Sequence, residues 1–133
     1  MLQVQDKLKV ECEPFLDELE QHGELVEPFL EPVDWKKWNM TEYPKVVKNP
    51  MDLGTVRKRL RNLKYNRVEE FAADIKLVWH NAKIWNDKNS VFYKSVLCLL
   101  PAVLVPAHYL LCLHTACCAV KCDIYQMCWC TGY

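Results

Sequence analysis

The clearest structural signal in the chain is the run 67–85, RVEEFAADIKLVWHNAKIW, in which apolar residues recur three and four positions apart. Acids and lysines occupy many of the positions between them. This spacing places apolar side chains on one side of an α-helix. The run therefore predicts an amphipathic helix that buries one stripe, formed by Val68, Phe71, Ala72, Ile75, Val78, Trp79, Ala82 and Trp85.

Two helices are predicted before this run. The first covers Leu2 to Gln21, where Pro14 predicts a kink or a late start, because an internal proline removes a backbone hydrogen bond. Gly23 can end it by adopting a positive φ. The second covers Met51 to Asn62 and has Asp52 in its first turn, where a carboxylate suits the helix dipole. Its predicted buried residues are Leu53, Val56 and Leu60.

A fourth helix is predicted after the polar turn 86–90. It begins at Val91 and runs to Leu100, where Pro101 interrupts it. The chain shows no alternating strand pattern that competes with these helices. The prediction is an all-α fold, an antiparallel four-helix bundle whose fourth helix is incomplete.

The segment from Val26 to Pro50 cannot form one continuous helix. It holds four prolines, yet it is too rich in aromatic residues to be disordered. Connections longer than about 12 to 15 residues are uncommon in compact domains and often carry function. We expect this loop to fold over one end of the bundle, near the polar turn after Trp85.

Composition excludes several classes of function. The chain of 133 residues has 17 basic and 17 acidic residues, so its net charge gives no general attraction to nucleic acid. With 3 glycines it cannot build backbone cradles for phosphate, and His22 and His80 have no evident catalytic partner. Neither an enzyme nor a cofactor is predicted.

A basic cluster lies in the second predicted helix. The run Arg57, Lys58, Arg59 and Arg61 could make weak contact with nucleic acid, but in a chain of zero net charge a solvated helix face is the favoured interpretation.

Asn86 is the candidate polar group at the floor of a pocket. It follows Trp79 by seven residues and Ala82 by four, which extends the buried stripe to the end of the helix. A carboxamide there can bind a neutral amide, since it both donates and accepts hydrogen bonds. The alternative, which spacing alone favours, is an asparagine that ends the helix in the left-handed conformation.

Four segments resemble the bromodomain signatures, in order and at the family's spacing, over about residues 3–97. They are EPFLEPVD at 27–34, YPKVVKNPMDLGTV at 43–56, YNRVEEF at 65–71 and NAKIWN at 81–86. The resemblance implies a left-handed four-helix bundle with a long loop between its first two helices, and it implies non-catalytic binding of acetylated lysine.

The resemblance also implies roles for individual residues. Asn86 matches the asparagine that bonds the acetyl carbonyl, and Tyr43 matches the tyrosine that reaches the same oxygen through a water molecule. The implied pocket walls, shelf and mouth are Phe29, Val33, Trp38, Met40, Trp85, Pro28 and Phe92. Glu27 departs from the tryptophan that one subgroup has at the shelf.

By this resemblance the partners are acetylated histone tails or other acetylated proteins, and the location is the nucleus. An unmodified lysine would have to bury its ammonium group without a paired carboxylate, at a cost of several kcal/mol. Acetylation removes that charge and adds a carbonyl acceptor. We expect micromolar to millimolar binding, roughly −4 to −8 kcal/mol.

Residues 98–133 differ sharply from residues 1–97. They hold seven of the eight cysteines, and Lys121 and Asp123 are their only Asp, Glu, Lys or Arg residues. The break favours a mistaken gene model, such as a retained intron or a shifted frame, that replaces the end of the fourth helix. On this interpretation residues 1–97 form the bundle and residues 98–133 form an atypical Cys-rich tail.

Other interpretations of the tail stay open. Residues 96–120 could anchor a small helical protein in a membrane, although Pro101 and Pro106 lie inside that stretch. Zinc binding is weaker, because no two cysteines have the usual two-residue gap. The chain could also be a truncated, non-functional bromodomain fragment. The possible zinc ligands are His108, His114, Cys117, Cys118, Cys122, Cys128 and Cys130.

Overall fold

The computed structural model describes residues 3–104, and their side chains as far as residue 99. These residues form helices and no strands, which confirms the predicted all-α fold. The α-helices are α1 (Val4–Glu20), α2 (Tyr43–Val46), α3 (Leu53–Arg61), α4 (Val68–Trp85) and α5 (Val91–Leu104). Two short 3-10 helices, η1 (Gly23–Leu25) and η2 (Glu27–Phe29), follow α1.

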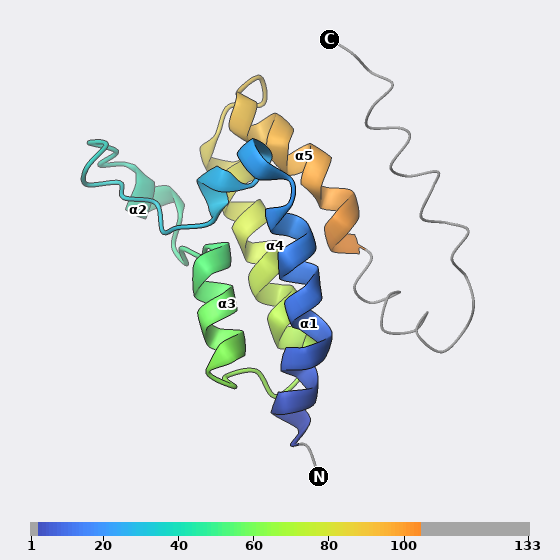
Figure 1. The fold of residues 1–133 in the computed structure, drawn as a ribbon. Coiled ribbons are helices and arrows are strands. Elements are labelled where there is room, and N and C mark those ends of the chain that lie inside the picture. The colour runs from blue at the N-terminus through green and yellow to red at the C-terminus, as the bar shows by residue number, and fades with distance from the viewer. Residues whose placement is uncertain (1–2, 105–133) are drawn as a thin grey trace.

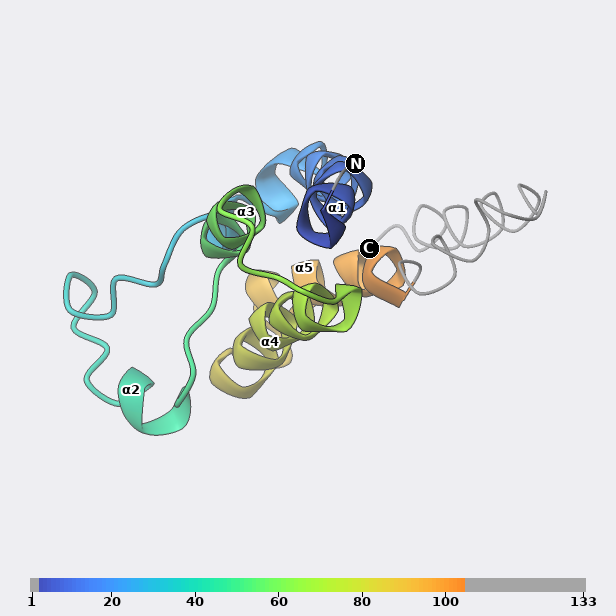
Figure 2. The ribbon, with the colours of Figure 1, turned by 90° about the horizontal axis from the view of Figure 1, so that it is seen from below.

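Four of these helices build the bundle. Helix α1 packs on α3, α3 packs on α4, and α4 packs on α5 (Figure 1). Seen from below, α1 and α3 lie on one side of the molecule and α4 and α5 on the other (Figure 2). Helix α2 lies on the long loop between η2 and α3 and contacts the bundle at α4 (Figures 1 and 2). The long loop between the first two bundle helices is therefore where the sequence predicts it.

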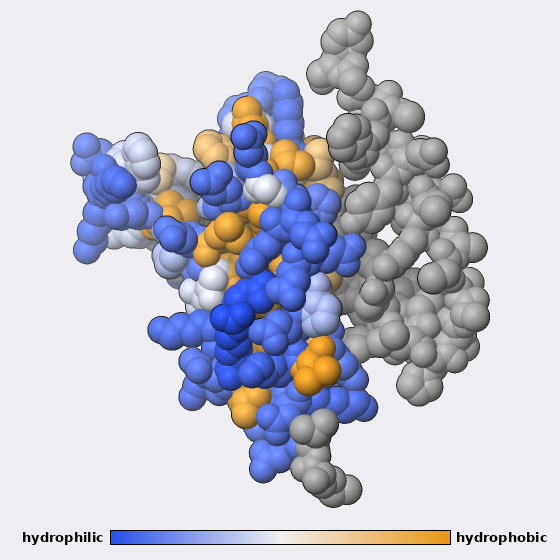
Figure 3. Space-filling model, viewed as in Figure 1, coloured by the Kyte–Doolittle hydropathy of each residue, from blue (hydrophilic) through white to orange (hydrophobic). Residues whose placement is uncertain are grey.

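The core is formed where the apolar stripes of the four helices meet. Phe71 of α4 packs edge to face against Phe15 of α1, with ring centroids 6.1 Å apart, and against Tyr65, at 5.8 Å. Val56, Trp79 and Phe71 are at most 2% exposed. Aromatic pairs in this geometry stabilise a core beyond the area that they bury. Figure 3 shows the hydrophilic face that covers this core, with small apolar areas between.

Helix α1 passes through Pro14, so a late start at that proline is wrong. Pro14 and Val10, whose carbonyl lies four residues earlier, are both exposed. A missing backbone hydrogen bond costs least on a face that water reaches. Gly23 has φ 55°, in agreement with the predicted use of a positive φ after the helix.

Asp52 caps helix α3 rather than standing in its first turn. Its backbone is extended, its carboxylate accepts a hydrogen bond from the Thr55 backbone N–H at 2.8 Å, and the Thr55 hydroxyl donates to it at 2.6 Å. A side-chain acceptor here satisfies a backbone donor that the helix leaves free. The helix therefore begins at Leu53, two residues later than predicted.

Helix α4 matches the predicted range within one residue. Glu70 accepts hydrogen bonds from the backbone N–H groups of Asn66 and Arg67, which sets the start of the helix. Most of the predicted stripe is buried, but Val68, Ala72 and Trp85 are only half-buried.

Helix α5 continues through Pro101 to Leu104, so the predicted interruption is wrong. Because Pro101 has no backbone N–H, the carbonyl of Leu97, four residues earlier, loses its usual helical hydrogen bond. Leu97 is 49% exposed, so this carbonyl lies on an outer face of the helix. Leu99 is 1% exposed, so the core reaches beyond residue 97. Within residues 3–104 no helix is long and apolar enough to span a membrane. The proposed zinc ligands and most of the proposed anchor lie outside the described residues.

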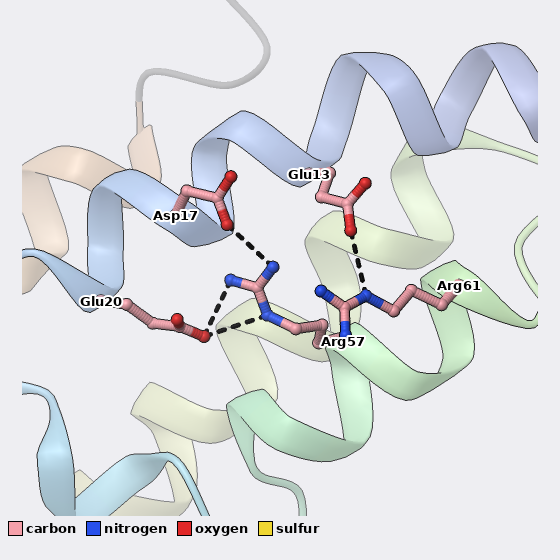
Figure 4. Close-up of polar contacts among 5 residues, drawn as sticks. All are labelled: Glu13, Asp17, Glu20, Arg57 and Arg61. Atoms are coloured by element: carbon pink, nitrogen blue, oxygen red, sulfur yellow. Dashed lines mark hydrogen bonds and ion pairs between the residues drawn. The ribbon is translucent and has the colours of Figure 1, made fainter.

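The three arginines of α3 are engaged by carboxylates. Arg57 donates to Asp17 and Glu20 of α1, each at 2.8 Å, and its side chain is only 13% exposed (Figure 4). Arg61 binds Glu13 at 3.0 Å, and Arg59 binds Asp74 of α4 at 2.6 Å. The prediction of a solvated basic face is wrong for Arg57, because its guanidinium group joins two helices.

Candidate functional site

The loop between η2 and α3, residues 30–52, leaves the bundle and returns to it (Figures 1 and 2). Its two ends are held together where the Gly54 N–H donates to the Leu30 carbonyl at 3.0 Å. A Cβ atom at position 54 would overlap that carbonyl oxygen. Only glycine permits this close backbone approach, so Gly54 sets where the loop begins and ends.

Asn81 fixes the returning arm of the loop to α4. Its Nδ2 donates to the Asn49 carbonyl at 2.7 Å, and Asn81 is 5% exposed. Because the buried Asn81 carboxamide donates to a loop carbonyl, it fixes the position of the loop backbone along α4. Sequence reasoning did not give Asn81 this role. The signal available was a polar residue next to Ala82 in an otherwise apolar stripe.

Tyr43 is the loop residue that packs on the end of α4. It begins the short helix α2, is 5% exposed, and meets Trp85 edge to face with ring centroids 5.1 Å apart. Burial raises the pKa of the Tyr43 hydroxyl, which keeps it protonated near neutral pH. The contact with Trp85 places Tyr43 beside the residue that precedes Asn86.

The turn 34–40 forms the outer part of the loop. Asp34 accepts from the Lys37 backbone N–H at 3.0 Å, and Asn39 adopts a φ of 53°. The Lys37 ammonium lies 5.4 Å from the centre of the Trp38 ring, which is itself 67% exposed. The cation–π contact with Lys37 holds the exposed Trp38 indole, which offers both an apolar ring and an N–H group for contact at the edge of the loop.

Asn86 ends α4 in an extended conformation, with φ −87° and ψ 144°. The left-handed helix end that spacing alone favours is therefore wrong. The Asn86 side chain is half-buried, and its Nδ2 donates to the Ala82 carbonyl at 2.8 Å. Among the described residues, neither the second hydrogen of Nδ2 nor Oδ1 has a hydrogen-bond partner.

The structure brings some of the predicted site residues together. Tyr43 contacts Trp85, and Phe29 packs on Trp79 with ring centroids 5.2 Å apart. Met40 is half-buried. The others are exposed and lie in η2, in the loop 30–52 or at the start of α5: Pro28, Val33, Trp38 and Phe92.

A recess is found elsewhere, on α3 and α4. It has a volume of about 730 Å³ and includes none of the residues predicted to bind acetyl-lysine, although Lys58 and Arg59 of the predicted basic cluster line it. The candidate site at Asn86 therefore consists of the anchored loop and the carboxamide, with no enclosed cavity found there among the described residues.

Comparison with known proteins decides the family. The family model described as Bromodomain matches residues 12–97. The chain belongs to the bromodomain family. This bromodomain is similar to "Transcription factor GTE1" of Arabidopsis thaliana, with 44% identity over half of the chain, and to a "Bromodomain-containing protein homolog" of Drosophila melanogaster, with 38% identity over 71% of the chain. It is also 44% identical over 66% of its length to "Bromodomain adjacent to zinc finger domain protein 2A" of Xenopus laevis.

The matched parts cover only 17%, 6% and 5% of those three relatives. Bromodomains are non-catalytic modules that read acetyl-lysine in chromatin regulators, so this chain is not an enzyme.

Proposed function

We propose that this bromodomain binds acetylated lysine through the carboxamide of Asn86, on histone tails or other nuclear proteins. One observation carries the proposal, which is the state of that carboxamide. One of its N–H groups is committed to the Ala82 carbonyl, and this bond orients the side chain at the end of α4. The remaining N–H can donate to an acetyl carbonyl, and Oδ1 can accept from an amide.

Tyr43 supports the same placement. Its ring is buried against Trp85, and among the described residues its hydroxyl makes no hydrogen bond. A protonated hydroxyl near the end of α4 can donate, through a water molecule, to the oxygen that Asn86 binds. Phe29, Val33, Met40 and Trp38 then supply apolar contacts to the lysine stem, and Pro28 and Phe92 contact the flanking peptide.

Charge explains selectivity for the modified side chain. The side chains of Asn86, Tyr43 and Trp85 are neutral at physiological pH, so none of these three can pair an ammonium group. Burying an unpaired ammonium costs several kcal/mol, whereas the acetyl amide is neutral. Acetylation therefore turns an excluded side chain into one that the site accepts.

The nuclear assignment rests on the relatives. Similar proteins include "Transcription factor GTE1" and, from Schizosaccharomyces pombe, the "SWR1 complex bromodomain subunit bdf1". A module that reads acetyl-lysine in such proteins acts on chromatin, and we place this chain in the nucleus on that basis.

The test compares acetylated and unacetylated histone peptides on an array, followed by calorimetry of the strongest ligand. Asn86→Ala should weaken binding by about 1 to 3 kcal/mol, or roughly 5- to 150-fold, because a buried acceptor loses its donor. Asn89→Ala is the matched control, since Asn89 is exposed in the same turn and uses only its backbone N–H. Equal binding by the wild type and Asn86→Ala would refute the assignment.

A further inference from the structure

The recess on α3 and α4 lies away from the proposed acetyl-lysine site. Residues 62–67, which border it, join the two helices at the end of the bundle opposite the C-terminal end of α4 (Figure 1). It is a surface depression of about 730 Å³ that is open to solvent. Its lining residues are Thr55, Lys58, Arg59, Asn62, Lys64, Tyr65, Glu70, Ala73 and Asp74.

Both carboxylates of the recess are already satisfied from within the protein. The Asp74 Oδ2 accepts from Arg59 Nη1 and from the Tyr65 hydroxyl, each at 2.6 Å. Glu70 accepts from the Asn66 backbone N–H at 2.8 Å, as part of the start of α4. Asp74 is neutralised by Arg59, whereas Glu70 keeps its negative charge because backbone N–H groups carry no net charge, so the lining residues of the recess together carry a net charge of +1.

Lys58 and Lys64 supply a surplus of positive charge. Both are exposed, and within the described part of the chain neither ammonium makes an ion pair or a side-chain hydrogen bond. The same recess is also lined by Ala73, which is exposed, and by Tyr65, which is 5% exposed. The recess thus combines apolar surface with two lysines that make no ion pair among the described residues.

We propose that this recess binds a short acidic peptide segment of a protein partner, with carboxylates paired to Lys58 and Lys64 and one apolar side chain against Ala73 and Tyr65. An extended peptide advances about 3.3 Å per residue, so a few residues suffice to follow the recess. Charge complementarity selects the partner, and the apolar surface supplies the contact area.

Duplex DNA fits this surface less well than a peptide does. Arg57, Arg59 and Arg61 are already paired with carboxylates of α1 and α4, so they are not free to pair with phosphates. The two remaining lysines could neutralise only a small number of phosphates, which is too few for stable binding at physiological salt.

The experiment titrates the full chain with a blocked peptide of sequence Asp-Glu-Leu-Asp-Glu-Leu-Asp-Glu and follows the backbone amide NMR signals of Asn62 and Ala73. We expect these signals to shift with saturation. The double variant Lys58→Glu/Lys64→Glu should weaken binding by about tenfold or more, since attraction becomes repulsion. Raising the salt concentration should also weaken it.

Three controls make the result specific. Lys94→Glu reverses an exposed charge on α5 and should leave the affinity unchanged within about twofold. Asn86→Ala should also leave it unchanged, since the two sites are separate. A peptide with lysine in place of every acid should not bind. Melting curves of the variants confirm that they fold.

The proposal is overturned if the acidic peptide causes no saturable shift, or if the double variant binds it as the wild type does. It is also overturned if a 12-base-pair duplex binds more tightly than the peptide and loses its affinity in the double variant, because the recess would then be a nucleic-acid contact.

Discussion

Individual hydrogen bonds decide the geometry around Asn86. The Ala82 carbonyl takes one N–H of the carboxamide, and the Asn49 carbonyl takes an N–H of Asn81 one turn earlier in the same region of α4. The first bond orients the proposed ligand contact, and the second holds the loop that carries Tyr43. Both hydrogen bonds are partly buried, so the loss of either leaves a carbonyl oxygen without a partner that water can fully replace.

Gly54→Ala should destabilise the fold by about 1 to 3 kcal/mol, because the new methyl group overlaps the Leu30 carbonyl and the backbone must move. Urea unfolding of the two proteins measures the difference. Gly23→Ala is a useful comparison, since no atom lies within 4 Å of a Cβ there and only the positive φ of 55° opposes it. A Gly54→Ala protein as stable as the wild type would show that the two backbones do not meet closely.

Cys12 predicts a loss of stability at alkaline pH. Burial, and secondarily Glu11, raises the pKa of the Cys12 thiol from 9.0 to about 11. Above pH 9 the unfolded chain releases this proton while the folded chain retains it, so the free energy of unfolding falls, at most by about 1.4 kcal/mol per pH unit. The stability that the protonated Cys12 thiol contributes to the folded state is fully present below pH 9 and is lost as the pH rises toward 11.

Chemical denaturation at pH 8, 9 and 10 tests this dependence. Cys12→Ala should show a shallower fall between pH 9 and 10 than the wild type, whatever its stability at pH 8. Identical slopes in the two proteins would exclude Cys12 as the source.

Among the elements, α1 and α3 are joined by charge as well as by apolar packing. Arg57 donates to Asp17 through Nη1 and to Glu20 through Nε and Nη2. The arginine side chain is 13% exposed, whereas the two acids are about half exposed, so only the guanidinium group gives up most of its water. Both bonds to Glu20 reach the same oxygen, and charge-assisted hydrogen bonds from a mostly buried guanidinium group are stronger than ordinary surface ion pairs.

Arg57→Met should lower the free energy of unfolding by about 1 to 2 kcal/mol, because it retains the packing of the stem but loses the charged fork. The loss should shrink at high salt, where screening weakens the wild-type pair. Arg61→Met is the matched comparison, since the Arg61 side chain is 58% exposed and binds a single acid among the described residues, Glu13, and it should cost less. Equal costs for the two variants would contradict the role assigned to Arg57.

At the scale of the whole molecule, the length of α5 decides how much of the core is complete. Val96 is fully buried and Leu99 is 1% exposed, and both belong to the same core as Trp79 of α4. The core therefore does not end at residue 97, where the charge of the sequence falls away and the family match stops.

A chain ending at residue 97 should be less stable than one ending at residue 104 by about 2 kcal/mol or more, since it loses the buried Leu99 side chain. Thermal melts of these two chains and of residues 1–133 measure the difference. If the two shorter chains melt alike, Leu99 does not belong to the core in solution. The melt of the full chain shows separately what residues 105–133 add.

Periodicity alone predicted the helices, because a stripe at three-and-four spacing must be buried and only a bundle buries several of them. It predicted α4 within one residue and the loop between the first two bundle helices. It did not reveal α2, whose single turn is too short to show a period. The end of α5 is also misplaced by the sequence pattern, because a proline weakens a helix at its position without having to end it.

The sequence by itself determined the family, the all-α class and the position of Asn86 at the end of a buried stripe, since these depend on residue order and spacing along one chain. Only the tertiary structure decided that Asn86 is extended and bonded to Ala82, that Asn81 holds the loop, and that the α3 arginines are paired with acids. Each of these depends on which distant carbonyl or carboxylate comes within hydrogen-bonding distance, and spacing along the chain does not contain that information.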